Sequence, residues 1–206
     1  MKPVDKKIYL ASKSPRRREL LRQVGIDFEL LLLRSDGPRG PDVTEEVHPG
    51  EAPLDYVARV ALEKAKFAAD LVTRRRMAPR PVLSADTTVT IDGAILGKPA
   101  NPAEATAMLQ QLSGRTHQVL TSIAVASADF AGQVTQVSEV RFGVLSPAAI
   151  AAYCASSEPY DKAGGYGIQG PAAQFIEHIS GSHSGIMGLP IFETVQLLRQ
   201  AGLPLP

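Results

Sequence analysis

The sequence predicts an α/β fold in which a mixed, twisted central sheet is flanked by helices. Apolar segments of strand length alternate along the chain with helical patterns, which is typical of this class. Asp92-Gly93 separates two apolar segments and indicates a hairpin, so the strands cannot all be parallel. A third observation concerns size: 206 residues without repeats or an obvious linker predict one domain over residues 1–206.

The first half of the chain alternates two strands with two helices. The predicted order is a strand at 7–12, a helix at 14–25, a strand at 28–33, a loop at 34–50 and a helix from 53 to about 74. Ser14 followed by Pro15 is a helix-start signal, because serine caps the free N–H groups and proline suits the first turn. Gly25 is a typical helix stop. The long second helix has apolar positions at Leu54, Val57, Ala61, Ala65 and Ala68.

The second half adds antiparallel hairpins and a glycine-rich loop. The predicted elements are strands at 82–91 and 94–96, a helix at 101–114, strands at 116–126 and 134–145, a short helix after 147, a loop at 156–170, a strand at 174–179 and a helix at 189–201. Alternation along 82–91 places Ala85 and Thr87 on one face and Ser84, Asp86 and Thr88 on the other.

Composition and charge exclude several protein classes. Twenty-two Lys and Arg against 21 Asp and Glu leave a net charge of +1, which excludes a strongly basic nucleic-acid binder. No apolar segment approaches the ~18 residues of a membrane span, and the first residues lack a secretory signal pattern. The single Cys154 cannot form an internal disulfide. We expect a cytoplasmic protein with no membrane segment and no stable nucleic-acid partner.

The first candidate site is the turn that contains Ser12, Ser14, Arg16, Arg17 and Arg18. Cations in a first helical turn are unfavourable by roughly 0.3–1 kcal/mol each, because the helix dipole is positive there. A bound phosphate would offset that cost, since free N–H groups and arginine both bind phosphate. A solvated basic face is the alternative, and the strand–Ser–Pro–helix context favours phosphate.

The second candidate is Asp86, an acid inside a strand, where acids are disfavoured. A hydrogen-bonded edge residue is the simple alternative. Lys98 on the returning strand favours function, because a two-residue turn pairs Thr87 with Lys98 and a longer turn pairs Asp86 with it. In the first register the two side chains point to opposite faces.

The third candidate is the glycine-rich segment 161–170. Gly165 to Gly170 matches G-x-G-x-x-G, but the segment leads into Pro171 and a strand and not into a helix, which excludes a dinucleotide site. The glycines instead permit a sharp turn or a close approach of the backbone to a ligand. Gln169 offers a donor and an acceptor, which suits the edge of a base. His178 and His183 lack a cysteine pair, so zinc is not expected.

Taken in order, these segments resemble the Maf family of nucleoside triphosphate pyrophosphatases. The resemblance covers nearly the whole chain. It is carried by Leu10-Ala11-Ser12, Ser14-Pro15-Arg16-Arg17, Glu63-Lys64-Ala65, Ser84-Ala85-Asp86-Thr87, Leu96-Gly97-Lys98-Pro99, Leu112-Ser113-Gly114-Arg115-Thr116-His117, Asp161-Lys162-Ala163-Gly164, Tyr166-Gly167-Ile168-Gln169-Gly170 and Gly188-Leu189-Pro190.

The resemblance implies hydrolysis of a nucleoside triphosphate to the monophosphate and pyrophosphate, with a divalent metal cation (Mg or Mn). It also implies a Maf/ITPase-like fold with a nucleotide-binding cleft and a homodimer. Asp86 then activates water, and Arg16, Thr87 and Gln169 select the base, in the pattern of the branch that acts on dTTP and UTP. The cations and hydroxyls expected to bind phosphate are Ser12, Ser14, Arg17, Lys64, Lys98 and Lys162.

The metal ligands implied by the resemblance are Asp86 and a second acid. The family carries an acidic residue soon after its second strand, and the loop 34–50 lacks the usual dipeptide. Counting back from Tyr56 makes Glu45 the best match and Glu46 the next.

Two other functions stay open at this point. One is a pyrophosphatase for a modified purine nucleotide such as 7-methyl-GTP. The other is a non-catalytic nucleotide-binding regulator of cell division, because the family has a historical link with septum formation. The preferred hypothesis is a dTTP/UTP pyrophosphatase that cleanses the nucleotide pool, with a possible role in cell-division arrest.

Overall fold

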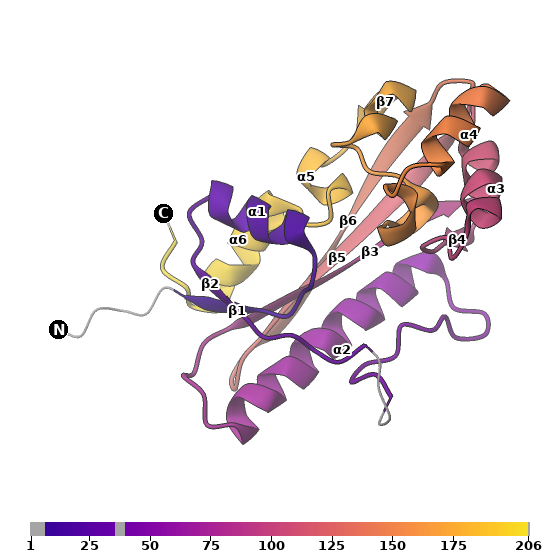
Figure 1. Ribbon diagram of the computed structural model, residues 1–206. Coiled ribbons are helices and arrows are strands. Elements are labelled where there is room, and N and C mark those ends of the chain that lie inside the picture. The colour runs from indigo at the N-terminus through magenta and orange to yellow at the C-terminus, as the bar shows by residue number, and fades with distance from the viewer. Residues whose placement is uncertain (1–6, 36–39, 206) are drawn as a thin grey trace.

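A seven-stranded mixed sheet forms the centre of the computed structural model, which describes residues 7–35 and 40–205 (Figure 1). Six strands run in the order β2 (Phe28–Leu30), β1 (Ile8–Leu10), β3 (Val82–Ile91), β5 (Thr116–Ala126), β6 (Ala131–Phe142) and β7 (Ile176–Ser180). The short β4 (Ala94–Leu96) pairs with β3. β1 is parallel to β2 and β3, and the other pairs are antiparallel, so the predicted mixed α/β sheet is confirmed.

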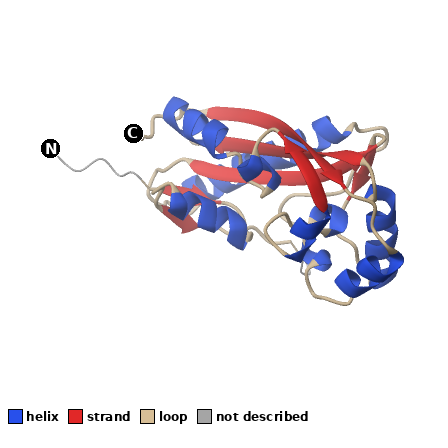
Figure 2. Ribbon diagram, turned by 90° about the horizontal axis from the view of Figure 1, so that it is seen from above, coloured by secondary structure: helices blue, strands red, loops and turns tan. Residues whose placement is uncertain are grey.

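Helices flank the long strands (Figure 2). Figure 1 shows α2 (Pro53–Arg74) along one face of the sheet, with α1 (Pro15–Gln23) and α6 (Ile191–Gln200) on the other. The remaining helices are α3 (Pro102–Leu112), α4 (Pro147–Cys154) and the short α5 (His183–Ile186). None of the helices within the described ranges is long and apolar enough to cross a membrane.

Strand alternation divides the core into layers. Val82 and Ala124 belong to clusters that include α2, whereas Leu83, Ala85 and Ile123 pack with α1 and α6. Farther along the same face as Leu83, a second cluster gathers side chains of β3, β5 and β6 with those of α3 and α4. The two clusters on that face leave a polar strip between them, where Thr87 pairs directly with Thr121.

Helix and turn signals predicted several boundaries correctly. Ser14 caps α1 by accepting a hydrogen bond from the N–H of Arg17, and Asn101 caps α3 in the same way. Gly25 follows α1 with a φ of 68°. Asp92 and Gly93 both have positive φ, at 53° and 79°, and form the expected two-residue turn between β3 and β4.

Other boundaries were wrong. The predicted strands at 7–12 and 28–33 shrink to Ile8–Leu10 and Phe28–Leu30, because the chain turns away into the loops around the cleft. The strand predicted at 134–145 starts at Ala131 and ends at Phe142, and the strand predicted at 174–179 is Ile176–Ser180, after a 3₁₀ turn at Pro171–Phe175. The helix predicted at 189–201 is Ile191–Gln200, preceded by α5, which the sequence did not indicate.

Two local expectations also need correction. Leu54, predicted on the buried face of α2, is half-exposed in the first turn, and Tyr56 and Val60 are buried there instead. The glycine-rich loop predicted at 156–170 contains two 3₁₀ turns, Pro159–Asp161 and Ala163–Gly165. Residues 1–6, 36–39 and 206, which include part of the predicted loop at 34–50, lie outside the described residues.

Candidate active site

A cleft opens at a gap along one edge of β3. On this edge β1 reaches β3 at Val82 and Leu83, and β4 pairs with it only from Val89 to Ile91. Between β1 and β4, residues 84–88 have no strand partner on this edge in the described part of the chain, although they pair with β5 on the other edge. The cleft measures about 1060 Å³, at the upper end of the roughly 300–1,000 Å³ usual for small-molecule sites.

The residues to which the family resemblance gave a role all line this one cleft, whereas Arg18 of the first candidate turn does not. They are Ser12, Ser14, Arg16, Arg17, Glu45, Lys64, Asp86, Thr87, Lys98, Lys162 and Gln169, and Glu46 lines it as well. They come from the first turn of α1 and the residues just before it, the loop before α2, α2 itself, β3, the segment after β4 and the glycine-rich loop. The fold therefore brings together six segments that are far apart in the sequence.

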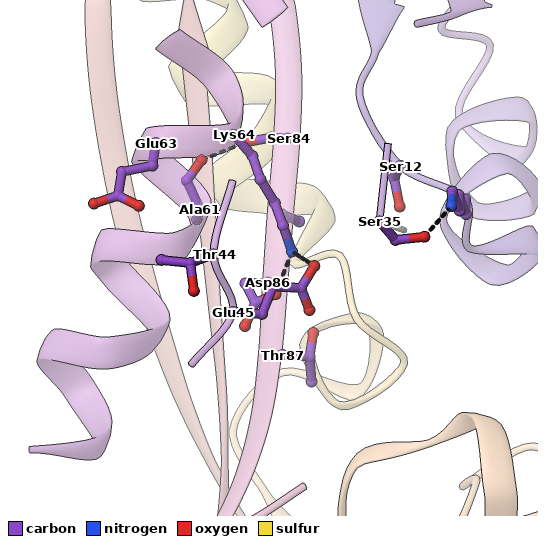
Figure 3. Close-up of polar contacts among 12 residues, drawn as sticks. Ser12, Ser35, Thr44, Glu45, Ala61, Glu63, Lys64, Ser84, Asp86 and Thr87 are labelled. Atoms are coloured by element: carbon purple, nitrogen blue, oxygen red, sulfur yellow. Dashed lines mark hydrogen bonds and ion pairs between the residues drawn. The ribbon is translucent and has the colours of Figure 1, made fainter. Parts of the chain in front are cut away.

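Lys64 joins the two acids of the cleft. Its Nζ lies 2.8 Å from Oδ1 of Asp86 and 2.8 Å from Oε1 of Glu45, as Figure 3 shows. Only 14% of the Lys64 side chain and 12% of the Asp86 side chain are exposed, so solvent screens this pair weakly. Glu46 has no ion pair with Lys64 among the described residues, and its carbonyl accepts a hydrogen bond from Arg59.

The surroundings keep Glu45 ionised. Burial alone raises the pKa of this carboxyl, but Lys64 outweighs burial, with Lys98 and Arg17 adding to its effect. The net result is a pKa below the ordinary glutamate value. The Tyr56 hydroxyl donates to the backbone carbonyl of Glu45 over 3.0 Å, which ties the loop to α2. Glu45 is thus a fixed negative charge beside Asp86.

Arg17 lies at the open edge of β3, and four of its five N–H donors are bound within the protein. Its Nε donates to the carbonyl of Gly188 over 2.7 Å, and its Nη1 donates to the carbonyl of Ala85 over 2.7 Å. The same guanidinium donates to the hydroxyls of Ser12 and Thr87, each over 3.1 Å. The planar fork therefore joins four separate points around the cleft.

The Thr87 hydroxyl lies inside a directed chain of hydrogen bonds. Thr121 donates its hydroxyl hydrogen to the carbonyl of Gly185 over 2.8 Å. The 3.0 Å contact between Thr87 and Thr121 is then donated by Thr87, since the Thr121 hydrogen is already used. Arg17 donates to the same Thr87 oxygen. The Thr87 hydroxyl thus accepts a hydrogen bond from Arg17 and donates its own hydrogen to Thr121. Toward the cleft the residue therefore sets the available space and offers no hydroxyl hydrogen.

The glycine-rich loop forms the opposite wall of the cleft. Gly164 has a φ of 69°, and a Cβ there would lie 2.9 Å from Val89, so glycine is needed for the loop to seat on β3. Arg16 pairs with Asp161 over 3.5 Å. Lys162 donates to the carbonyl of Glu158 over 2.7 Å. Gln169 is exposed on this wall, as is Lys98 across the cleft.

The acids of the cleft suit a hard divalent cation. Asp86 and Glu45 converge on one point, where Lys64 already places a positive charge. Outside residues 1–6, 36–39 and 206, no cluster of three or more metal-binding side chains occurs. This donor set fits Mg²⁺, which is usually held by one or two carboxylates together with substrate phosphates and water.

Several residues in or next to the cleft received no role in the sequence analysis. Tyr56, Thr121 and Asp161 each hold a residue that was singled out, through the contacts with Glu45, Thr87 and Arg16 given above. Glu158 lines the cleft as well. Their sequence signals were weak, because a buried threonine in a strand and an acid in a loop are both common.

Comparisons with known proteins place this chain among relatives of one family. The family described as Maf-like protein matches residues 7–201. The chain is 54% identical over 207 residues to a dTTP/UTP pyrophosphatase of Aromatoleum aromaticum, covering 100% of both chains. It is 55% identical to the dTTP/UTP pyrophosphatase of Ralstonia nicotianae, over 96% of this chain and 95% of that one. Among solved structures, the Staphylococcus aureus Ham1 protein is similar with a TM-score of 0.45 and 15% identity, over 66% of this chain and 71% of that chain.

Proposed function

The chain belongs to the Maf-like protein family, and we propose that it is an enzyme that hydrolyses dTTP and UTP to the nucleoside monophosphate and pyrophosphate. Its relatives named dTTP/UTP pyrophosphatase support this assignment, being 50–55% identical over nearly their full length. The structural observation that carries it is the convergence of Asp86 and Glu45 on Lys64 at the open edge of β3.

Asp86 acts as the general base in the proposed reaction. Its carboxylate accepts a proton from water while the water oxygen forms a bond to the α-phosphorus. The bond from that phosphorus to the bridging oxygen breaks, and pyrophosphate leaves with the bonding electron pair. Lys64 holds the carboxylate in place through its 2.8 Å contact, so the base is oriented before substrate enters.

Glu45 and Asp86 would together hold a divalent cation, Mg²⁺ or Mn²⁺. When bound, this cation supplies positive charge to the phosphate oxygens, which lowers the cost of the charge that develops during phosphoryl transfer. The hydrogen bond from Tyr56 to the Glu45 backbone would hold the loop that carries this acid against α2.

Cations and hydroxyls around the cleft bind the triphosphate in this proposal. Lys98 is exposed and free to move toward phosphate oxygens, and Lys162 reaches from the opposite wall. Ser12 and Ser14 lie at the start of α1, where the helix dipole favours an anion. Arg17 contributes chiefly its charge, because four of its five N–H donors are already bound to protein acceptors.

Arg16, Thr87 and Gln169 form the proposed base-selecting end. Gln169 can donate to and accept from a base edge, while Thr87 limits the space and holds Arg17. A homodimer, a single domain over residues 1–206, a cytoplasmic location and the absence of a stable nucleic-acid partner stay predictions. So does the role in nucleotide-pool cleansing and cell-division arrest.

The test is a product analysis with a panel of nucleotides. The purified protein is incubated with Mg²⁺ or Mn²⁺ and dTTP, UTP, CTP, GTP, ATP, ITP or 7-methyl-GTP, and products are identified by ion chromatography. We expect monophosphate and pyrophosphate, formed fastest from dTTP and UTP, and no turnover after chelation of the metal. Fastest turnover of 7-methyl-GTP would contradict the substrate assignment. Binding without any product would favour the nucleotide-binding regulator.

A further inference from the structure

Glu158 is a partly exposed acid of the cleft that the proposed reaction does not use. It lies directly before the 3₁₀ turn Pro159–Asp161 and lines the cleft. Its Oε2 is shielded from solvent and receives no hydrogen bond from the residues that the structure describes. An unpartnered buried carboxylate oxygen is costly and calls for an explanation, since buried polar groups are nearly always paired.

The glycine-rich loop is shaped around this carboxylate. A Cβ on Gly170 would lie 1.8 Å from Oε1 of Glu158, and one on Gly167 would lie 3.1 Å from it. Only glycine therefore allows the loop backbone to pass so close to the acid. Gln169 stands between these two glycines in the sequence and also lines the cleft, so Glu158 and Gln169 belong to the same wall.

Burial raises the pKa of the Glu158 carboxyl, against the opposing effects of Lys162 and Arg16. A hydrogen-bond donor from a bound molecule would relieve this cost. Lys162 forms no hydrogen bond with Oε2 of this carboxylate; its Nζ donates instead to the backbone carbonyl of Glu158 and to Asp161.

Thymine and uracil offer the donor that this acid lacks. Both bases present an N3–H between two carbonyl oxygens, whereas cytosine presents a bare N3 beside an amino group. A carboxylate can only accept hydrogen bonds, while the Gln169 amide can donate to a carbonyl oxygen. An acceptor from Glu158 and a donor from Gln169 on one wall of the cleft would thus match the edge of thymine or uracil, and the carboxylate would repel the lone pair of cytosine N3.

We propose that Glu158 determines base specificity by accepting the N3–H of thymine or uracil. This inference deepens the proposed function and rests on it. A contact from Glu158 to the ribose is the competing role. It predicts equal effects on UTP and CTP, because these two substrates carry the same sugar and phosphates.

The test compares kcat/KM for UTP, dTTP and CTP in the wild type, in Glu158→Gln and in the control Glu177→Gln, whose carboxylate pairs with Arg141 outside the cleft. The glutamine amide can turn its oxygen to N3–H or its nitrogen to cytosine N3. We expect the UTP:CTP ratio to fall at least about tenfold in Glu158→Gln, the size of one buried hydrogen bond to a charged group. The dTTP:UTP ratio stays constant, because both bases carry N3–H.

The outcomes separate the two proposals. A wild type that hydrolyses neither dTTP nor UTP overturns the proposed function and this inference with it. If the wild type hydrolyses both and the variant keeps the wild-type UTP:CTP ratio, or loses all three activities equally, only the inference is overturned. Should Glu158→Gln fail to fold, the wild type is assayed with N3-methyl-UTP and 5-methyl-UTP. Hydrolysis of N3-methyl-UTP as fast as UTP overturns the inference, and selective loss of that activity supports it.

Discussion

The ammonium nitrogen of Lys64 lies 2.8 Å from a carboxylate oxygen of Asp86. This contact joins α2 to β3 across the face of the sheet. The same nitrogen also lies 2.8 Å from a carboxylate oxygen of Glu45. One lysine thus balances two acids at the open edge of the strand, which explains how two carboxylates can lie so close together in a partly buried cleft.

We expect Asp86→Asn to remove most turnover and keep the fold. The amide oxygen still accepts a hydrogen bond from Lys64, and Glu45 still pairs with that lysine. The amide cannot take a proton from water, so kcat for dTTP should fall about 10²–10⁴-fold, the usual contribution of a general base. Steady-state kinetics measure the loss, and circular dichroism checks the fold.

The matched control for that variant is Asp92→Asn. Asp92 sits in the β3–β4 turn with a φ of 53°, which asparagine adopts readily, and it pairs with Arg115 away from the cleft. Its kcat should stay within about twofold of the wild type, as expected for a surface ion pair. Equal activity of Asp86→Asn and wild type would show that another group activates the water.

Glu45→Gln should raise the concentration of Mg²⁺ or Mn²⁺ needed for half-maximal activity by at least about tenfold. Glu45 contacts Lys64 beside Asp86, and replacing its charge removes one of two expected ligands. Glu46→Gln is the matched control, since its neighbouring carboxylate makes no such ion pair in the described part of the chain. A larger effect from Glu46→Gln than from Glu45→Gln would exchange the two assignments.

Much of the fold follows from local patterns. The strands Val82–Ile91, Ala94–Leu96 and Thr116–Ala126 agree with the sequence prediction to the residue, because each ends at a turn signal or a helix cap. The wrong boundaries occur where tertiary contacts determine where a strand ends. The chain after Leu10 leaves the sheet because Ser12 turns toward Arg17, and nothing in residues 7–12 indicates that.

The sequence predicted which residues form the site but not the hydrogen bonds and ion pairs between them. Motif order identified the residues that line the cleft, whereas their partners depend on distant segments that only folding brings together. Arg17 shows the difference. The sequence suggests a phosphate ligand, and the structure shows its donors bound to Gly188, Ala85, Ser12 and Thr87. No spacing rule connects residues 17 and 188.

Arg17→Lys should destabilise the protein by about 3 kcal/mol and lower kcat/KM for dTTP, although the charge is kept. A lysine cannot reach four acceptors, so the carbonyls of Ala85 and Gly188 lose a donor. Urea unfolding measures the change. The control is Arg18→Lys, at the next position of α1 and not among the residues that line the cleft, and its stability should stay within about 1 kcal/mol of the wild type. Equal losses in both variants would contradict the special role of Arg17.

His117 should make the protein less stable as the pH falls from 6.5 toward 4. The ring is 2% exposed, its Nε2 lies 2.7 Å from the Tyr166 hydroxyl, and burial lowers its pKa from the ordinary 6.5 to about 4. Between these values the unfolded chain binds a proton that the folded protein excludes, so the free energy of unfolding decreases with falling pH. The stabilisation is fully present above pH 6.5, and the loss by pH 4 approaches about 3 kcal/mol.

The pH slope of stability separates this effect from packing. His117→Phe keeps an aromatic ring beside Phe142 but has no titrating nitrogen, so its free energy of unfolding should vary less between pH 6.5 and 5 than that of the wild type, even though the lost contact to Tyr166 lowers its value throughout. Urea titrations at half-unit intervals of pH measure both quantities. His178→Phe, on exposed β7, is the control and should keep the wild-type slope. A wild-type slope in His117→Phe as well would mean that the buried ring does not exclude the proton.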